Sequence, residues 1–107
     1  FNNGGSPSIN NWDVSKVGTM FQMFSGVTAF NQPLGKWNLS GITAQGSESI
    51  QNSLAAMFRG ATAFDQDLSN WEKTLPQGLK DLTEPPKWIF TGTKLAASKK
   101  KWPESWR

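Results

Sequence analysis

The chain has 107 residues, enough for one domain but not for two independent cores, and it contains no cysteine and no histidine. Disulfides, thiol nucleophiles, an imidazole base and nearly all zinc sites are therefore excluded, and no apolar run approaches the ~18 residues of a membrane span. The net charge of +3 is unevenly distributed, because residues 87–107 hold six basic groups and one acidic group, whereas residues 1–86 hold five basic and seven acidic groups.

The first predicted element is a short amphipathic helix over residues 17–24. Four apolar residues have the i, i+3, i+4, i+7 spacing of one helical face: Val17, Met20, Phe21 and Phe24. Asp13 or Ser15 is a suitable cap at its start. Gly26 suits the left-handed position just past its end.

A short strand followed by a turn is predicted next, over residues 30–39. Phe30, Leu34 and Trp37 lie in a polar setting without helical spacing, which favours a strand, with a plain loop as the alternative. Pro33 argues against an unbroken ladder of hydrogen bonds. Gln32 shares strand parity with Phe30, so we expect it to point inward and bond along the stack. The alternative is an exposed polar row that contacts a ligand.

Both elements recur along the chain. Residues 23–34 (MFSGVTAFNQPL) return as residues 57–68 (MFRGATAFDQDL), and a weaker third copy begins at residue 89 (IFTG). Trp37 and Trp71 follow the two full copies at the same distance, and Trp12 holds the same place one unit earlier. The interval from Trp37 to Trp71 is longer than that from Trp12 to Trp37, and the additions fall near residues 44–52 and 76–86. Since Phe1 falls in the middle of a unit, we expect the chain to be a fragment of a longer protein or a processed product.

One helix and one strand of this size cannot bury their apolar faces alone, but stacked copies can. The expected fold class is therefore an α/β repeat solenoid of about three turns, each a short strand plus a short helix. Residues 1–92 form the predicted solenoid and residues 93–107 a basic C-terminal cap or tail. Equivalent residues are expected to form four structural columns: Phe1, Phe30 and Phe64; Ile9, Leu34 and Leu68; Trp12, Trp37 and Trp71; Phe24, Phe58 and Phe90.

The motif Met-Phe-x-Gly-x-x-x-Phe followed by Asn-Gln-x-Leu-x-x-Trp resembles the BspA-type leucine-rich-repeat family, which is abundant in surface lipoproteins of mycoplasmas. The resemblance covers residues 1 to about 92 and rests on residues 23–37, the matching part of residues 57–71, and residues 12–17. It implies a right-handed, leucine-rich-repeat-like coil, an extracellular or cell-surface location and no enzymatic activity. The resemblance does not identify a ligand. The insertions and the loss of the motif after Gly92 depart from a regular tandem array.

Catalytic and metal-binding patterns are weak. Asp65 and Asp67 are the right residue types for calcium, but the second unit has Asn31 and Pro33 there, so we expect a solvated loop. The residues after the tryptophans include Asn38, which favours a polar surface column over a pair of catalytic carboxylates. We therefore expect no enzyme, no metal and no cofactor.

The basic C-terminal segment holds the candidate partner-binding residues: Lys99, Lys100, Lys101, Trp102, Trp106 and Arg107. One interpretation is a solvated cap whose tryptophans cover the open end of the core. The other is electrostatic contact with an acidic partner or an anionic surface. Nucleic-acid binding and direct membrane insertion are not expected.

The functional hypothesis is a non-enzymatic protein-interaction module of a cell-surface or secreted repeat protein. A structural or linker subunit within a larger assembly is the first alternative, in which case the location could be intracellular. A carbohydrate-binding module is the second. These hypotheses are separated by what the exposed surface contacts.

Overall fold

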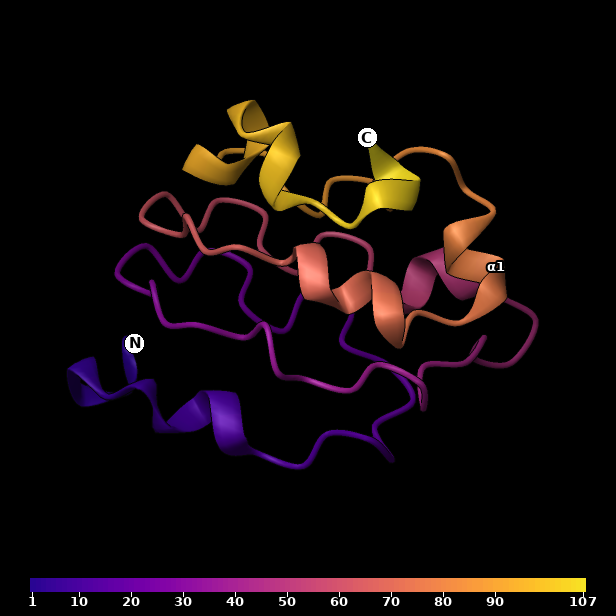
Figure 1. The fold of residues 1–107 in the computed structure, drawn as a ribbon, viewed down its shortest axis with the longest axis horizontal. Helices are drawn as coiled ribbons and strands as arrows, with labels where there is room; N and C mark the ends of the chain where they lie inside the picture. The colour runs from indigo at the N-terminus through magenta and orange to yellow at the C-terminus, as the bar shows by residue number, and fades with distance from the viewer.

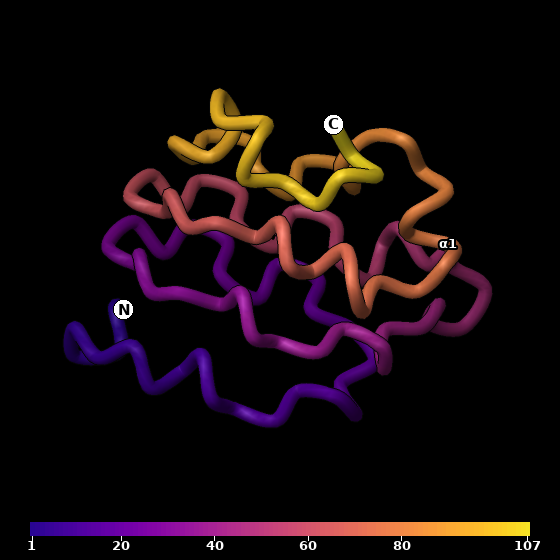
Figure 2. Tube along the Cα trace, viewed as in Figure 1, coloured from indigo at the N-terminus to yellow at the C-terminus, as the bar shows by residue number.

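Successive stretches of the chain lie on top of one another in layers (Figure 1). The computed structural model describes residues 1–107, with the N-terminal residues at one end of the stack and the C-terminal residues at the other. The Cα tube in Figure 2 shows the same order, from indigo at one end to yellow at the opposite end. The radius of gyration is 12.6 Å, close to the ~13 Å of a compact domain of this length.

Regular secondary structure is confined to eight short helical turns. In chain order they are η1 (Asn3–Gly5), η2 (Pro7–Asn11), η3 (Ile50–Ser53), η4 (Ser69–Lys73), α1 (Gln77–Lys80), η5 (Lys94–Ala97), η6 (Lys99–Lys101) and η7 (Glu104–Trp106). All are 3-10 turns except α1, and no strand is present.

The expected fold class, an α/β repeat solenoid with one strand and one helix per turn, is therefore wrong. Strands are absent, and the helical residues form isolated short turns, none longer than the 5 residues of η2 and η4. The molecule is a compact globule of stacked turns and loops. The leucine-rich-repeat geometry implied by the resemblance is likewise not found.

The predicted helix over residues 17–24 is absent for a local reason. Gln22 has a φ of +57°, and a left-handed residue interrupts a right-handed helix. Phe21, expected on the buried face, is 52% exposed. In the second unit only η3 is helical, and in the third the one α-helical turn, α1, directly follows Pro76.

Three backbone rows link the layers where those helices were expected: row 1 (residues 19–26), row 2 (residues 53–60) and row 3 (residues 87–92). Alternate N–H groups of row 1 donate to row 2, from Met20, Gln22, Phe24 and Gly26 to the carbonyls of Ser53, Ala55, Met57 and Arg59, at 2.7–3.2 Å. Row 2 donates to row 3 in the same way, from Ala56, Phe58 and Gly60 to Lys87, Ile89 and Thr91, at 2.8–3.0 Å. Because the intervening residues close turns within their own row, these rows are not strands.

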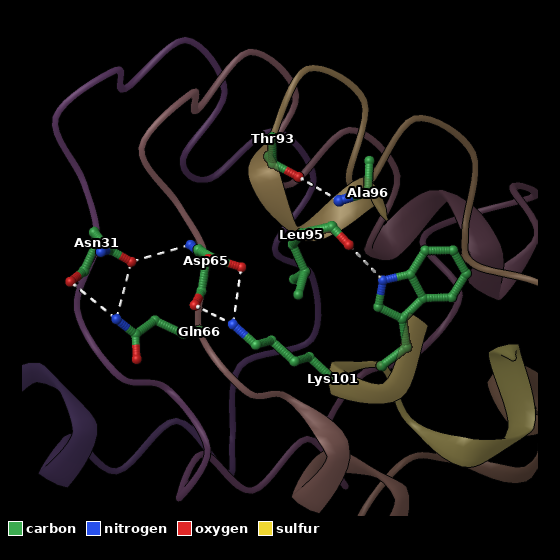
Figure 3. A network of polar contacts seen from close by, with 8 residues as sticks. Asn31, Asp65, Gln66, Thr93, Leu95, Ala96 and Lys101 are labelled. Carbon is green, nitrogen blue, oxygen red and sulfur yellow. Dashed lines mark hydrogen bonds and ion pairs between the residues drawn. The ribbon is translucent and has the colours of Figure 1, made fainter. Parts of the chain in front are cut away.

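On the opposite side of the layers, side chains replace a backbone ladder. The Oδ1 of Asn2 accepts the N–H of Asn31 at 2.8 Å, and the Oδ1 of Asn31 accepts the N–H of Asp65 at 3.0 Å. Gln32 donates to the Oδ1 of Asn2 and Gln66 to the Oδ1 of Asn31, which confirms that they bond along the stack. Figure 3 shows the bond from Gln66 to Asn31. The predicted strand over residues 30–39 is absent because these contacts leave no backbone ladder.

Phenylalanine rings stack between layers and form the centre of the core. The ring centroids of Phe24 and Phe58 are 5.6 Å apart, and those of Phe58 and Phe90 are 6.4 Å apart. Phe30 and Phe64 lie 5.7 Å apart with an interplanar angle of 8°. These rings belong to one core of 23 buried residues that reaches from Ile9 to Trp106. Their burial removes a large apolar area from water, which is the main favourable term in folding.

Buried tryptophans add one hydrogen bond between layers each. The Nε1 of Trp37 donates to the carbonyl of Ile9 at 2.8 Å, and the Nε1 of Trp71 donates to the carbonyl of Leu34 at 2.9 Å. These bonds satisfy indole donors that would otherwise be buried without a partner. Trp12, at the equivalent place in the first layer, is 55% exposed.

Candidate functional site

An aromatic groove opens beside the rows, next to the first insertion. It has a volume of about 690 Å³ and is lined by Thr19, Phe21, Gln45, Glu48, Asn52, Ser53, Ala55, Lys87 and Trp88. Phe21 and Trp88 are 52% and 46% exposed, which is unusual for large apolar side chains in a well-packed domain. Residues 44–52 form one wall, and Lys87 and Trp88 directly follow the second insertion. The first insertion and the residues just after the second therefore line the groove.

The exposed position of Trp88 follows from the backbone. Its φ of +63° is left-handed, as are those of Gln22 and Ala56 at the equivalent places in the other rows. Two cations lie over its ring: the Lys87 Nζ is 4.6 Å from the ring centroid and the Arg59 guanidinium carbon is 5.1 Å away. Such cation–π contacts hold an exposed indole in place and bring positive charge beside it.

Polar side chains on the insertion wall are already hydrogen-bonded to the protein. The Nε2 of Gln45 donates to the carbonyls of Gly18 and Thr43, each at 3.3 Å, which fixes the loop to the first layer. The Asn52 amide donates to the Glu48 carboxylate. The wall is therefore held in shape before any ligand arrives.

The lining of the groove combines two aromatic rings with a few polar and charged side chains. Glu48 is its one carboxylate, and no second acid, histidine or cysteine lines it. No group of three or more potential metal ligands occurs in the structure. Exposed aromatic rings beside cations and amides are instead the side chains that recur in macromolecular interfaces.

Sequence reasoning missed this groove. The predicted helix places Phe21 on a buried face, and Trp88 lies just before the third copy, which begins at residue 89. The available signal was a lack of repetition: Phe21 matches Ala55 and Lys87 in the other units, and Trp88 matches Gln22 and Ala56. The stacked phenylalanines of the core have counterparts in other units, whereas these two aromatic residues have none.

The structure separates the six candidate residues of the basic segment into two groups. Trp102 and Trp106 are 8% and 1% exposed and pack on Phe90, so they are not available to a partner. Lys101 is half-buried and pairs with Asp65, its Nζ 3.1 Å from the Oδ1 (Figure 3). Only Lys99, Lys100 and Arg107 are exposed.

Carboxylates that sequence reasoning considered for metal or catalysis have local partners. Hydrogen bonds from the Ser69 side chain and backbone hold the pKa of Asp67 below its ordinary value, and Ser15 does the same for the pKa of Asp13. Asp13 thus closes a turn with Ser15 and caps no helix. Asp65 is the partner of Lys101.

Glu72 ties the C-terminal segment to the third layer. Its Oε1 accepts the N–H of Ser105 at 2.8 Å and its Oε2 accepts the Ser105 hydroxyl at 2.6 Å. Burial raises the pKa of Glu72, but the hydrogen bonds from Ser105 outweigh this effect, so its pKa lies below the ordinary value of 4.5. The carboxylate is a structural clamp here.

Comparison with known proteins gives one match. A family model described as Mycoplasma protein of unknown function, DUF285, matches residues 2–82. No curated protein and no solved structure matches the chain. None of its helical turns has the length and apolar character needed to cross a bilayer. The resemblance to mycoplasma proteins is confirmed at this level, while its leucine-rich-repeat part is not. The chain belongs to the Mycoplasma family DUF285.

Proposed function

We propose that this chain is a non-enzymatic interaction module that binds a macromolecular partner through the aromatic groove. The observation that carries the proposal is the exposure of Phe21 and Trp88 on a groove whose wall is already held in shape. Interfaces are enriched in aromatic residues and arginine, and a few such residues supply most of the binding energy. Arg59 and Lys87 beside Trp88 add positive charge that favours an acidic region of the partner.

A protein partner fits the groove better than a carbohydrate does. A sugar ring stacks on a free aromatic face, but cations lie over the Trp88 ring within 4.6 and 5.1 Å of its centroid. The polar wall contributes few free amide donors, since Gln45 and Asn52 are bonded to the protein. These contacts favour polypeptide over glycan.

The proposed location is the cell surface of a mycoplasma or the medium around it. Support comes from membership of a Mycoplasma family and from the resemblance to surface proteins of these organisms. The partner is then a protein on a host cell or on the mycoplasma itself.

A cell-binding experiment tests the proposal. Fluorescently labelled chain is added to cultured host cells, and saturable binding is measured before and after the cells are treated with protease or with glycosidases. We expect protease, but not glycosidases, to remove the binding sites. The double variant Phe21→Ala, Trp88→Ala is expected to lose at least about tenfold in affinity, since truncating hot-spot residues costs about 2 kcal/mol or more.

The matched control is Met23→Ala, which truncates an apolar residue that is 44% exposed but does not line the groove. It should bind as the unchanged chain does. Equal losses in both variants, or binding removed only by glycosidases, would contradict the proposal.

A structural role within a larger assembly is the second candidate. It is favoured by an apolar hollow of about 820 Å³ at the N-terminal end of the stack. If the chain is such a subunit, it should be poorly stable alone. A cooperative, monomeric melt of residues 1–107 would count against this role.

A further inference from the structure

Row 1 presents a line of unpaired carbonyl groups at the N-terminal end of the molecule. In row 2 the carbonyls of Ser53, Ala55, Met57 and Arg59 accept hydrogen bonds from the preceding row. Their equivalents in row 1 accept no hydrogen bond within the chain: Thr19, Phe21, Met23 and Ser25. These oxygens occur at every second residue, as the acceptors of row 2 do. Row 1 is therefore an open edge of the same hydrogen-bond ladder that joins the layers inside the molecule.

An apolar hollow lies beside this open edge. It has a volume of about 820 Å³, and its lining is hydrophobic except for Asp13: Phe1, Ile9, Trp12, Val14, Val17, Met23, Phe24, Val27 and Trp37. Phe1 and Trp12 are 63% and 55% exposed there. In the interior layers the equivalent residues, Phe30 and Trp37, are 0% and 2% exposed because another layer covers them.

Trp12 also lacks the hydrogen bond that its equivalents make. Trp37 and Trp71 each donate their indole N–H to a carbonyl of the preceding layer. The Nε1 of Trp12 donates to no atom of the chain. The N-terminal face thus offers three kinds of contact at once: acceptors in a line, an apolar hollow and one indole donor.

The opposite end of the molecule does not match this face. The N–H groups of Trp88, Phe90 and Gly92 in row 3 are also unpaired. However, η5 closes the core beside them, with Leu95 fully buried and its carbonyl bonded to Trp102 (Figure 3). That end has only a small hollow of about 240 Å³, so it cannot supply the flat apolar surface of a layer. Two copies of the chain cannot pair through their N-terminal faces either. Row 1 of each copy has a line of free carbonyls but no line of free N–H groups to donate to the other.

We propose that the N-terminal face binds a further turn of polypeptide with the Met-Phe-x-Gly pattern of rows 1 and 2. The molecule itself shows the contact twice, where row 1 lies on row 2 and row 2 lies on row 3. Such a turn donates alternate N–H groups to the four free carbonyls and places its phenylalanine over Phe24, while the segment that leads into it offers a carbonyl to the indole of Trp12. Addition of backbone to an open edge gives affinity through main-chain bonds, and the side-chain hollow gives specificity.

An extended form of the chain tests this pairing. A copy of residues 9–29, with its own tryptophan replaced by phenylalanine, is joined directly before Phe1. The residues that precede Phe1 then match those that precede Phe30. The measurement uses a Trp88→Phe background, in which Trp12 is the one strongly exposed tryptophan. We expect acrylamide quenching of Trp12 to fall severalfold and the Tm to rise by more than about 5 °C.

The control carries the same added residues in scrambled order, with phenylalanine and glycine moved from their places. It should leave both the quenching and the Tm unchanged. The proposal is overturned if the ordered copy behaves like the scrambled one. It is also overturned if the unextended chain dimerises with concentration and protects Trp12 by itself, because a second copy would then be the occupant.

Discussion

Left-handed residues recur at equivalent places in the three rows. Gln22, Ala56 and Trp88 have φ values of 57°, 56° and 63°. A non-glycine residue in this region costs about 1–2 kcal/mol, so it persists only where other contacts hold it. For Gln22 and Ala56 that contact is a hydrogen bond, because the backbone N–H of each residue donates to a carbonyl of the next row.

Gly41 is a residue whose lack of a side chain allows two layers to meet. A Cβ at this position would overlap the carbonyl oxygen of Ser15 and lie 2.9 Å from its carbonyl carbon, both of them backbone atoms that cannot turn aside. We expect Gly41→Ala to lower the free energy of unfolding by about 1–3 kcal/mol through forced separation of the layers. Chemical denaturation of Gly41→Ala and the unchanged chain measures this difference in the free energy of unfolding.

The control for that change is Gly35→Ala. Its Cβ would meet its nearest neighbour, the carbonyl oxygen of Asp67, at 3.4 Å, which is ordinary contact. The expected change is within about 0.5 kcal/mol. Equal destabilisation by both substitutions would show that Gly41 has no special role.

Trp71 offers a second test at the scale of one residue. Trp71→Phe removes the indole N–H and leaves the Trp37 N–H as the remaining donor to the buried carbonyl of Leu34. We expect the loss of this hydrogen bond to lower the free energy of unfolding by about 0.5–1.5 kcal/mol. Trp12→Phe makes the same change at an exposed position and should have little effect. Urea titration followed by circular dichroism distinguishes the two variants, and similar midpoints would contradict the assigned bond.

At the scale of elements, sequence patterns predicted turns better than helices and strands. The left-handed conformation predicted for Gly26 is confirmed, and Gly60 and Gly92 have the same conformation at the equivalent places. The prediction of a helix over residues 17–24 was wrong, because its i, i+3, i+4 spacing was read as one face. The N–H groups of Met20 and Phe24 actually bond carbonyls of row 2, which is distant in sequence. Local periodicity carries no information about such partners.

The aromatic groove shows a related limit of sequence reasoning. Repetition identifies residues that serve the core, so the stacked phenylalanines were recognisable from the unit alone. Phe21 and Trp88 do not repeat, and the groove that they share is formed with residues of the first insertion, Gln45, Glu48 and Asn52. Their shared surface could not be predicted without the three-dimensional arrangement.

The C-terminal segment is predicted to loosen in acid. Because the pKa of Glu72 is lowered in the folded chain, its bonds to Ser105 contribute stability above the ordinary value of 4.5, and this contribution is lost as the pH falls through the folded pKa. We therefore expect hydrogen exchange of the backbone amides in residues 102–107 to accelerate, relative to the core, below pH 4.5.

Glu72→Gln tests the cause of that effect. The amide retains the shape of the side chain but does not titrate, so the segment's acid-dependent loosening should be smaller than in the unchanged chain. An unchanged pH profile in Glu72→Gln would assign the loosening to another group.

At the scale of the whole molecule, stability depends on repeated contacts between layers that are distant in sequence. The Phe24–Phe58–Phe90 and Phe1–Phe30–Phe64 stacks cross every layer boundary, and the backbone rows follow the same direction. The correspondence between equivalent aromatics was recognisable from sequence. The compact, strandless form was not, because it depends on left-handed residues and side-chain bridges that no periodicity reveals.

The most direct test of this layered arrangement is the nuclear Overhauser effect between the rings of Phe30 and Phe64, measured on selectively labelled phenylalanine. The two rings belong to different units of the sequence, yet their centroids are 5.7 Å apart and their planes are nearly parallel, at 8°. Strong ring-to-ring cross-peaks between Phe30 and Phe64 are the predicted result. Well-ordered rings that each show cross-peaks to other neighbours, and none to each other, would contradict the layered fold.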